Sequence, residues 1–283
     1  MPELPDLLYI QKYLQRNLTG RVIEDVAVHE PVVVRTAVAG DAARVLCGLS
    51  LSGTNIHGPF LRITVSDSLE IVVNLMLAGR LQHQTPMEKP LPYRCFTLGF
   101  DDASRLHLCD RKKMAKISII RRGDYVQIPR YATQGVDILS EGFTPEHFQR
   151  LAREHCRKQV RVFINDHTIL SAIGNAYADE ILFDAGIHPK TFVRSLAAPS
   201  LMQLYDSIRT VIMWGARCVE EAGLPIHIKV RDHMKVRNRK GKPCVRCGTT
   251  IRREGVRGHD VFFCPHCQPP TRTLFIDWRT LER

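Results

Sequence analysis

Four of the nine cysteines form two Cys-x2-Cys pairs near the end of the chain, with sixteen residues between the pairs. Tight turns at this spacing bring four thiolates into a tetrahedron, and four sulfur ligands close the coordination shell of Zn²⁺. We therefore predict one structural zinc ion and no catalytic metal. The alternative is four unrelated free thiols. The predicted ligands are Cys244, Cys247, Cys264 and Cys267.

Between the two pairs, residues Thr249 to Phe263 read as a short hairpin that the zinc would support. Arg257 and His259 lie near its tip, together with other arginines. Such a basic tip can contact phosphates or enter a groove of DNA. The alternative is that these side chains only solvate the tip.

The charge of the chain points to a polyanionic partner. Lys and Arg exceed Asp and Glu by 40 to 29, which gives a formal charge of +11. Nucleic acid is the simplest partner for such a chain, and an indifferent basic surface is the alternative. The remaining cysteines are scattered singly beside apolar residues, as in a reducing compartment. No apolar run approaches the roughly 18 residues of a membrane span, and the acidic start of the chain is unlike a signal peptide. We expect a cytoplasmic, nucleoid-associated protein without a membrane partner.

The first part of the chain predicts a β-rich domain. Apolar residues from Leu4 to Leu14 follow helical spacing, and Thr19-Gly20 gives a stop. Short β-branched or alternating segments then follow, separated by turn residues. An N-terminal helix followed by five to seven strands indicates a β-sandwich or barrel. The expected strands are Val22 to Val28, Ile63 to Val65, Glu70 to Leu75, Cys95 to Phe100, Arg105 to Cys109 and Lys116 to Arg121.

From about residue 144 the pattern becomes helical. Thr144 followed by Pro145 and Glu146 is a good helix start, and Pro199 to Ala222 is the longest helical segment. A basic stretch then leads into the cysteine pairs. The fold class is therefore α+β. The expected division is 1–130 for an N-terminal β-rich domain, 131–143 for a linker, 144–235 for a helical domain, 236–270 for a zinc finger and 271–283 for a C-terminal extension.

Two further segments can carry chemistry. A Gly174-Asn175 turn between helical segments leaves backbone N–H groups at a helix start, where a phosphate binds well. Asn175 can cap that helix and donate its amide to the phosphate, although a plain cap fits the residues equally well. If Met1 is removed, Pro2 becomes a secondary amine with a pKa of about 8, against about 10.4 for Lys, so far more of it is neutral and nucleophilic at physiological pH. Glu3 can then move protons, although many chains begin with Met-Pro for no such reason.

In combination these motifs resemble the formamidopyrimidine-DNA glycosylase and endonuclease VIII family of base-excision repair enzymes. The resemblance rests on Met1-Pro2-Glu3-Leu4-Pro5-Asp6, on Gly174-Asn175-Ala176-Tyr177-Ala178-Asp179-Glu180 and on the cysteine pairs followed by Gln268. It implies an N-terminal β-sandwich, a helix–two-turn–helix domain and a zinc finger. It also implies that Pro2 is the nucleophile, that Glu3 is the acid and base, and that Asn175 binds a phosphate, with Tyr177 beside it at the DNA.

The chain departs from the family at several DNA-facing positions. Pro59 stands where the family usually has a Lys near the lesion, and Arg62 is a candidate substitute. The loop that fills the gap left by the flipped base is represented by Asn74, Met76 and Leu77. The cation and wedge opposite the lesion are expected at Lys112 or Lys113 and at Met114, although these can also be ordinary surface residues.

Two more departures concern the substrate. The chain between Gly223 and Lys242 leaves little room for the long loop that caps 8-oxoguanine, and His259 replaces the usual finger Arg. Oxidised pyrimidines, ring-opened purines and crosslinks all stay open.

We expect a monomeric DNA glycosylase with abasic-site lyase activity that acts on double-stranded DNA containing damaged bases or abasic sites. The alternative is a damaged-DNA-binding protein on the same scaffold, with glycosylase activity lost or restricted to abasic sites. A zinc-ribbon RNA-binding or transcription protein would explain the charge and the cysteines but not the N-terminal pattern.

Overall fold

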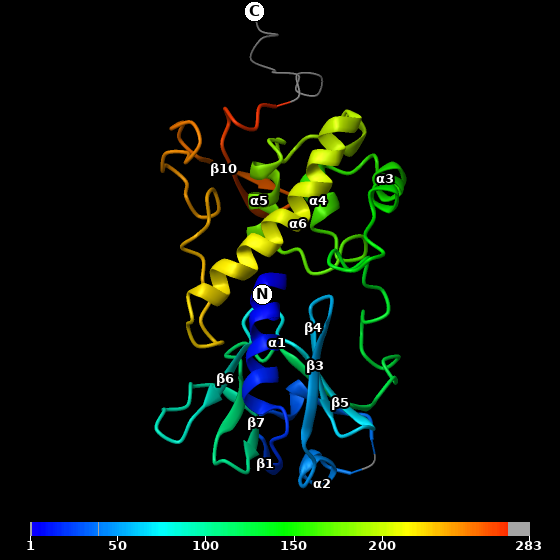
Figure 1. The fold of residues 1–283 in the computed structure, drawn as a ribbon, viewed down its shortest axis with the longest axis vertical. Coiled ribbons are helices and arrows are strands. Elements are labelled where there is room, and N and C mark those ends of the chain that lie inside the picture. Colours follow the sequence, from blue (N-terminus) through cyan, green and yellow to red (C-terminus); the bar gives the residue numbers. More distant parts are fainter. Residues whose placement is uncertain (1, 39, 271–283) are drawn as a thin grey trace, which may run out of the picture.

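The computed structural model describes residues 2–38 and 40–270. A β-rich half and a helical half meet at the start of the first helix, and the C-terminal hairpin lies beside the helices (Figure 1). Met1 and the expected C-terminal extension, 271–283, lie outside the described residues. Among the described residues no helix has the length and apolar character needed to cross a membrane.

The leading helix α1 (Leu4–Leu18) connects the two halves. Its buried side chains recur at helical spacing, and it packs against both strand β3 (Leu51–His57) and the long helix α6 (Ala198–Glu221). Glu3 is the N-cap, and its backbone N–H donates to the carboxylate of Asp6 at 2.8 Å. Helix α1 ends at Leu18, with Thr19 as its C-cap, and the following Gly20 has a φ of +84° that favours glycine.

The expected β-sandwich is confirmed. One sheet has the order β1-β7-β8-β6, and the other has the order β2-β9-β5-β4-β3. All neighbouring pairs are antiparallel except β2 with β9. Apolar side chains from both sheets and from α1 form the core between the layers. The strands are β1 (Ile23–Val28), β2 (Val34–Thr36), β4 (Phe60–Val65), β5 (Leu69–Asn74), β6 (Arg80–Gln84), β7 (Arg94–Phe100), β8 (Arg105–Cys109) and β9 (Lys116–Arg121).

The described sandwich has nine strands rather than five to seven. Strands β2, β3 and β6 were not expected, because their polar residues hide the alternation. In β3, for example, Thr54 exchanges hydrogen bonds with the backbone and side chain of Gln11 on α1. The short helix α2 (Ala42–Leu46) and the 3₁₀ turn η1 (Pro31–Val33) were also not expected.

The expected helical half is present, with a helix that begins after Thr144 and a long helix over almost all of the expected segment Pro199 to Ala222. It contains α3 (Pro145–Glu154), α4 (Val160–Ile164), α5 (Asn175–Asp184), the 3₁₀ turn η2 (Val193–Ser195) and α6. Thr144 caps α3 by accepting from the His147 N–H at 3.2 Å. These helices enclose a second apolar core, which Leu4 of α1 joins. The finger hairpin consists of β10 (Arg252–Val256) and β11 (His259–Phe263).

Candidate active site and nucleic-acid interface

The start of α1 is buried at the junction of the two halves. Pro2 is buried, and the Leu4 N–H donates to the Ala172 carbonyl at 3.2 Å, which ties the first turn to the helical half. Glu3 is also buried. The two residues expected to carry catalysis therefore lie at the border between the halves.

The Glu3 carboxylate is held by the start of α5. It accepts hydrogen bonds from the backbone N–H groups of Ala176 and Tyr177, both at 3.0 Å. A Cβ at Gly174 would stand 2.3 Å from Glu3 Cδ, so only glycine leaves room for this side chain. Burial raises the pKa of Glu3, and the two N–H donors and Arg231 act against that rise. Glu3 is thus a positioned carboxyl group that keeps its proton to a higher pH than an exposed glutamate.

These contacts correct the interpretation of the Gly-Asn turn. Gly174, not Asn175, is the N-cap of α5, and Asn175 is the first helical residue. The backbone donors at this helix start bind the Glu3 carboxylate, so they are not open to a phosphate in this structure.

Arg231 closes the site from the other side. Its guanidinium donates to both carboxylate oxygens of Asp6, at 2.8 and 2.6 Å, and its charge centre lies 5.5 Å from the ring centroid of Tyr177. The Tyr177 side chain is completely buried, and its hydroxyl lies 3.1 Å from His233 Nε2. In this conformation Tyr177 has no surface to offer DNA, and it instead supports Arg231 and the Glu3 contact.

Asn175 remains a candidate phosphate ligand because a buried arginine orients it. Arg161 donates to the Asn175 Oδ1 at 2.9 Å and to the buried carboxylate of Asp179 at 2.9 Å. Since Oδ1 is occupied, the amide nitrogen is the group that Asn175 can turn towards a ligand. Within residues 2–38 and 40–270, that nitrogen donates to no other group.

Two buried carboxylates of α5, those of Asp179 and Glu180, attach the segment before the finger to the helices. Asp179 also pairs with Arg237 at 2.8 Å. The Glu180 carboxylate accepts from three successive backbone N–H groups, of Lys235, Val236 and Arg237, at 2.9 to 3.0 Å. The segment that leads into the finger therefore has a defined position relative to α5.

The four cysteines of the finger fit one structural zinc ion. Their Sγ atoms lie within 4.8 Å of one another, with pairs such as Cys247 and Cys264 at 3.5 Å and Cys244 and Cys267 at 3.9 Å. A tetrahedron of Zn–S bonds of about 2.3 Å requires separations of this size. Gln268 accepts from the Cys264 N–H and donates to the Ile187 carbonyl, so it joins the metal centre to the helical half.

The tip of the finger faces the side chain that orients Asn175. Arg257 and His259 line a hollow of about 200 Å³ together with Arg161 and Asn165. Three of the predicted DNA contacts, Asn175, Arg257 and His259, are thus brought to one region.

The loop after β8 presents the two lysines. The buried Asp110 carboxylate accepts from the N–H groups of Lys112, Met114 and Ala115, at 2.8 to 2.9 Å, and so fixes the loop. Lys113 pairs with Glu30 at 2.8 Å. Among the described residues no carboxylate pairs with Lys112, which favours Lys112 over Lys113 as the cation for DNA.

The loop after β5 presents the remaining candidates. Asn74 Oδ1 accepts from the Met76 N–H at 2.9 Å, and Met76 has a φ of +48°. Leu77 is 56% exposed and is the better placed of the two apolar residues to fill a gap in DNA.

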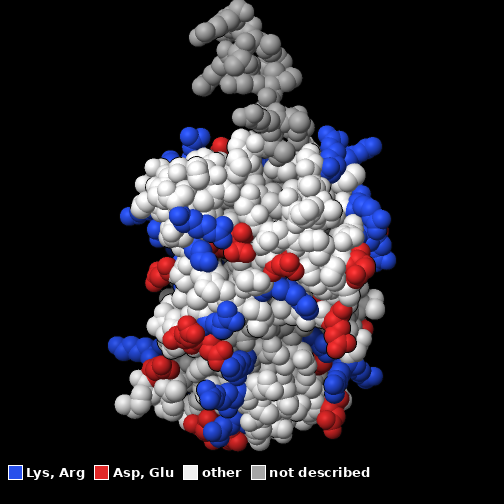
Figure 2. All heavy atoms as spheres, turned by 45° about the horizontal axis from the view of Figure 1, so that its top comes forward, with Lys and Arg blue, Asp and Glu red and all other residues white. Residues whose placement is uncertain are grey.

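Arg62, the candidate substitute for the family's lysine, is paired within the protein. Its guanidinium pairs with the buried carboxylate of Glu70 at 2.7 Å and lies over the ring of Tyr125. The face in Figure 2 carries Lys and Arg side chains beside Asp and Glu side chains rather than one basic field.

Three family models match successive parts of the chain. They are the formamidopyrimidine-DNA glycosylase N-terminal domain over residues 1–117, the H2TH domain of the same enzyme over 134–223, and the zinc finger found in FPG and IleRS over 241–270. The chain belongs to the formamidopyrimidine-DNA glycosylase family.

Named relatives cover nearly the whole chain. It is 28% identical to formamidopyrimidine-DNA glycosylase from Pelotomaculum thermopropionicum and 29% identical to that from Bacillus cereus, each over 95% of this chain and 99% of the relative. Among solved structures, Fpg of Lactococcus lactis in complex with DNA containing an abasic site has a TM-score of 0.84 at 23% identity. The MutM (Fpg) protein of Thermus thermophilus has a TM-score of 0.81 at 25% identity. Both cover 95% of this chain and 100% of the solved chain. The fold is therefore that of this family.

Sequence reasoning missed the roles of Arg231 and Arg161. Arg231 was visible only as one cation of a basic stretch, and Arg161 only as a residue of a short helix. No local signal marks either one, because their partners Asp6 and Asp179 are distant along the chain. Asp6 was quoted as part of the N-terminal motif, but its partner was not identified.

Proposed function

We propose that this protein is a DNA glycosylase with abasic-site lyase activity in base-excision repair. The observation that carries the proposal is the buried Pro2-Glu3 pair, whose carboxylate is held by Ala176 and Tyr177 at the junction of the halves. The relatives are named formamidopyrimidine-DNA glycosylases, and solved neighbours contain DNA with an abasic site or an oxidised pyrimidine. The proposed partner is double-stranded DNA that carries such damage.

In the proposed reaction Pro2 acts as an amine after removal of Met1. Its nitrogen lone pair attacks C1′ of the damaged nucleotide, and the bond from C1′ to the base breaks. The proton that the attacking amine loses balances the charge of the departing base. Glu3 in its protonated form donates its proton to the ring oxygen as the sugar ring opens, which produces a Schiff base and leaves a carboxylate that can accept the C2′ proton. Loss of a C2′ proton then expels the 3′ phosphate, and a second elimination expels the 5′ phosphate.

Around this reaction we assign supporting roles to the DNA-contact candidates. Asn175, Lys112, Arg257 and His259 hold phosphates, and Leu77 or Met76 fills the space of the flipped nucleotide. We propose the same division of the chain, with 1–130 catalytic, 144–235 and 236–270 for binding DNA, 131–143 as linker and 271–283 as extension.

The test is borohydride trapping on a duplex with one abasic site, using protein whose Met1 is verified as removed. We expect a covalent protein–DNA band, and Pro2→Gly should lose most of it, because an N-terminal glycine offers a primary amine in place of the secondary amine of proline. Glu3→Gln should lose base excision from damaged DNA but keep part of the trapping. Tight binding without any covalent band would instead support the damaged-DNA-binding alternative, which the replacement of the family's Lys by Pro59 motivates.

A further inference from the structure

A cavity of about 640 Å³ lies against the outer face of the five-stranded sheet. In β9, Ile117 and Ile119 point into the core, so Ser118 and Ile120 point to the opposite side, where they line the cavity. Residues 127–130 and Gln134, which follow the sheet in the sequence, line its other side. Sites for small organic ligands have volumes of about 300–1,000 Å³, so the cavity has room for a molecule of that size.

The residues that line the cavity suit a ligand that combines an apolar ring with a negatively charged group. Phe60, Ile120 and Ile128 are buried and form an apolar floor. Arg35 and Arg130 are exposed lining residues, so the charge lies at the mouth. A third cation, Lys116, also lines the cavity, whereas none of the lining residues, all of them described, is acidic. A nucleotide combines a flat base with an anionic phosphate and matches both features.

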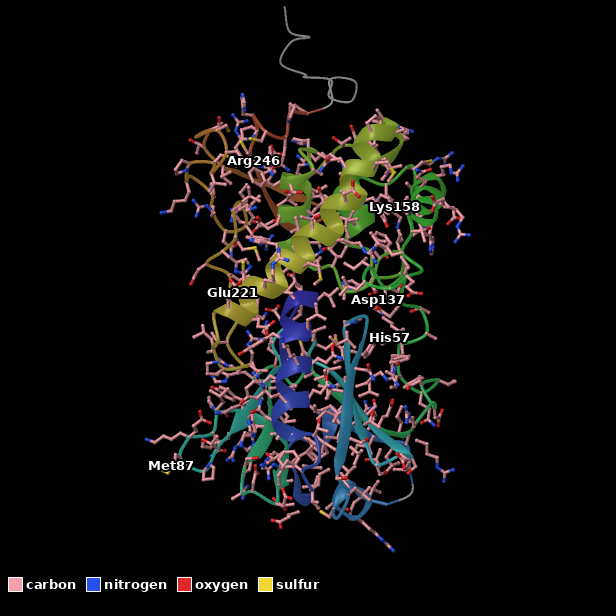
Figure 3. All side chains as sticks on the ribbon, in the orientation of Figure 1. His57, Met87, Asp137, Lys158, Glu221 and Arg246 are labelled. Carbon is pink, nitrogen blue, oxygen red and sulfur yellow. The ribbon has the colours of Figure 1, made fainter. Side chains whose placement is uncertain are left out.

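The cavity opens beside the proposed DNA interface. Pro59, Asn74 and Met76 belong to its wall, and the last two are candidates for contact with DNA. Figure 3 shows His57, at the end of β3, at the junction between the two halves. The loop that starts at Asn74 leads to Arg80. Burial lowers the pKa of Arg80, and the charge of Asp6 acts against that lowering, so Arg80 lies near the first turn of α1. One loop therefore borders both the cavity and the surroundings of the active site.

We propose that this cavity receives one everted nucleotide of the damaged strand, next to the lesion. The base would lie on the floor of Phe60, Ile120 and Ile128, and its phosphate would meet Arg35, Lys116 and Arg130. The inference rests on the proposed function, because it requires DNA to run past Asn74. It assigns to the protein a second nucleotide site, separate from that of the flipped lesion at Pro2.

The test compares two duplexes that carry the same tetrahydrofuran abasic analogue. In one, the neighbouring nucleotide is paired, and in the other it faces a mismatch and is therefore easier to evert. Wild type should bind the mismatched duplex about tenfold more tightly than the paired one. Ala37→Trp should fill the cavity and reduce that ratio to near one, because Ala37 lies in its wall. Equal ratios for wild type and Ala37→Trp would overturn the proposal.

A second pair of variants tests the charge at the mouth and does not depend on repacking. Arg130→Gln should lower the ratio, whereas Arg121→Gln, at an exposed position outside the cavity, should leave it unchanged. If Ala37→Trp fails to fold, Arg130→Gln and Arg121→Gln still test the cavity. Equal effects of these two substitutions on the ratio of affinities would overturn the proposal.

Borohydride trapping on the same proteins separates this inference from the proposed function. Trapping that persists in Ala37→Trp, together with a lost preference for the mismatch, supports the cavity as a nucleotide site. Normal trapping with an unchanged preference overturns the cavity proposal alone. Absence of trapping in wild type overturns the lyase proposal, while the binding ratios still test the cavity.

Discussion

The side chain of Glu3 occupies the place that a Cβ on Gly174 would take. The distance from that Cβ to Glu3 Cδ would be 2.3 Å, which real structures do not tolerate. The absence of a side chain at position 174 therefore allows a carboxylate of the β-rich half to reach the first N–H groups of α5. The connection joins residues that are far apart in the sequence and places the proposed acid at the junction of the halves.

Gly174→Ala should displace Glu3 and reduce base excision at least tenfold. Overpacking of this kind also costs about 1–3 kcal/mol of unfolding free energy. Excision from damaged duplex DNA and urea unfolding would measure the two effects. Gly255→Ala is the matched control, because a Cβ there would meet nothing within 4 Å. Excision by Gly174→Ala at the rate of Gly255→Ala would contradict the role of this contact.

The pH dependence of base excision should reflect the raised pKa of Glu3. Burial favours the protonated carboxyl, so the acid form persists to a higher pH than in an exposed glutamate. As pH rises through that pKa the acid is lost, while the neutral fraction of the Pro2 amine increases. The profile of kcat/KM should therefore be bell-shaped. Any residual excision by Glu3→Gln should lack the fall that deprotonation of this acid causes. A fall at the same pH in that variant would assign the acid to another group.

Removal of zinc should impair DNA binding without unfolding the β-sandwich. Cys264→Ser removes one of four ligands, and the finger depends on the metal for its fold. We expect about one zinc ion per wild-type chain and, in the variant, little zinc and at least tenfold weaker DNA binding. Metal analysis and gel shift would measure these effects. Cys218→Ser, outside the cluster, is the control and should retain zinc and affinity.

The two lysines after Asp110 should differ in their contribution to DNA binding. Lys113 already pairs with Glu30, whereas Lys112 is positioned by the Asp110 turn without such a partner among the described residues. Lys112→Ala should weaken binding and reduce the slope of log affinity against log salt by about 0.9. Lys113→Ala should change the slope less. Equal slopes for the two variants would remove Lys112 from the interface.

Local patterns were sufficient for much of the fold. Strand β9 and helix α3 follow from β-branched residues and from a Thr-Pro-Glu helix start, and both lie where the sequence indicated. Strand β3 was missed because its polar residues show no clear alternation, and one of them, Thr54, is buried by its contact with Gln11 of α1. The cap of α5 was assigned to Asn175 rather than Gly174, because the side chain that binds this helix start comes from residue 3.

The sequence by itself determined the four cysteines of the metal site and the α+β class, because spacing and pattern carry that information locally. It supplied the Pro2-Glu3 pair as a prediction that the proposed trapping experiment tests. Tertiary structure alone decided that Arg231 binds Asp6, that Arg161 orients Asn175, and that Arg62 turns to Glu70. It also decided that a cavity lies behind Asn74. The physical reason is that a buried charge needs a partner, and its choice depends on which distant segments the packed cores bring together.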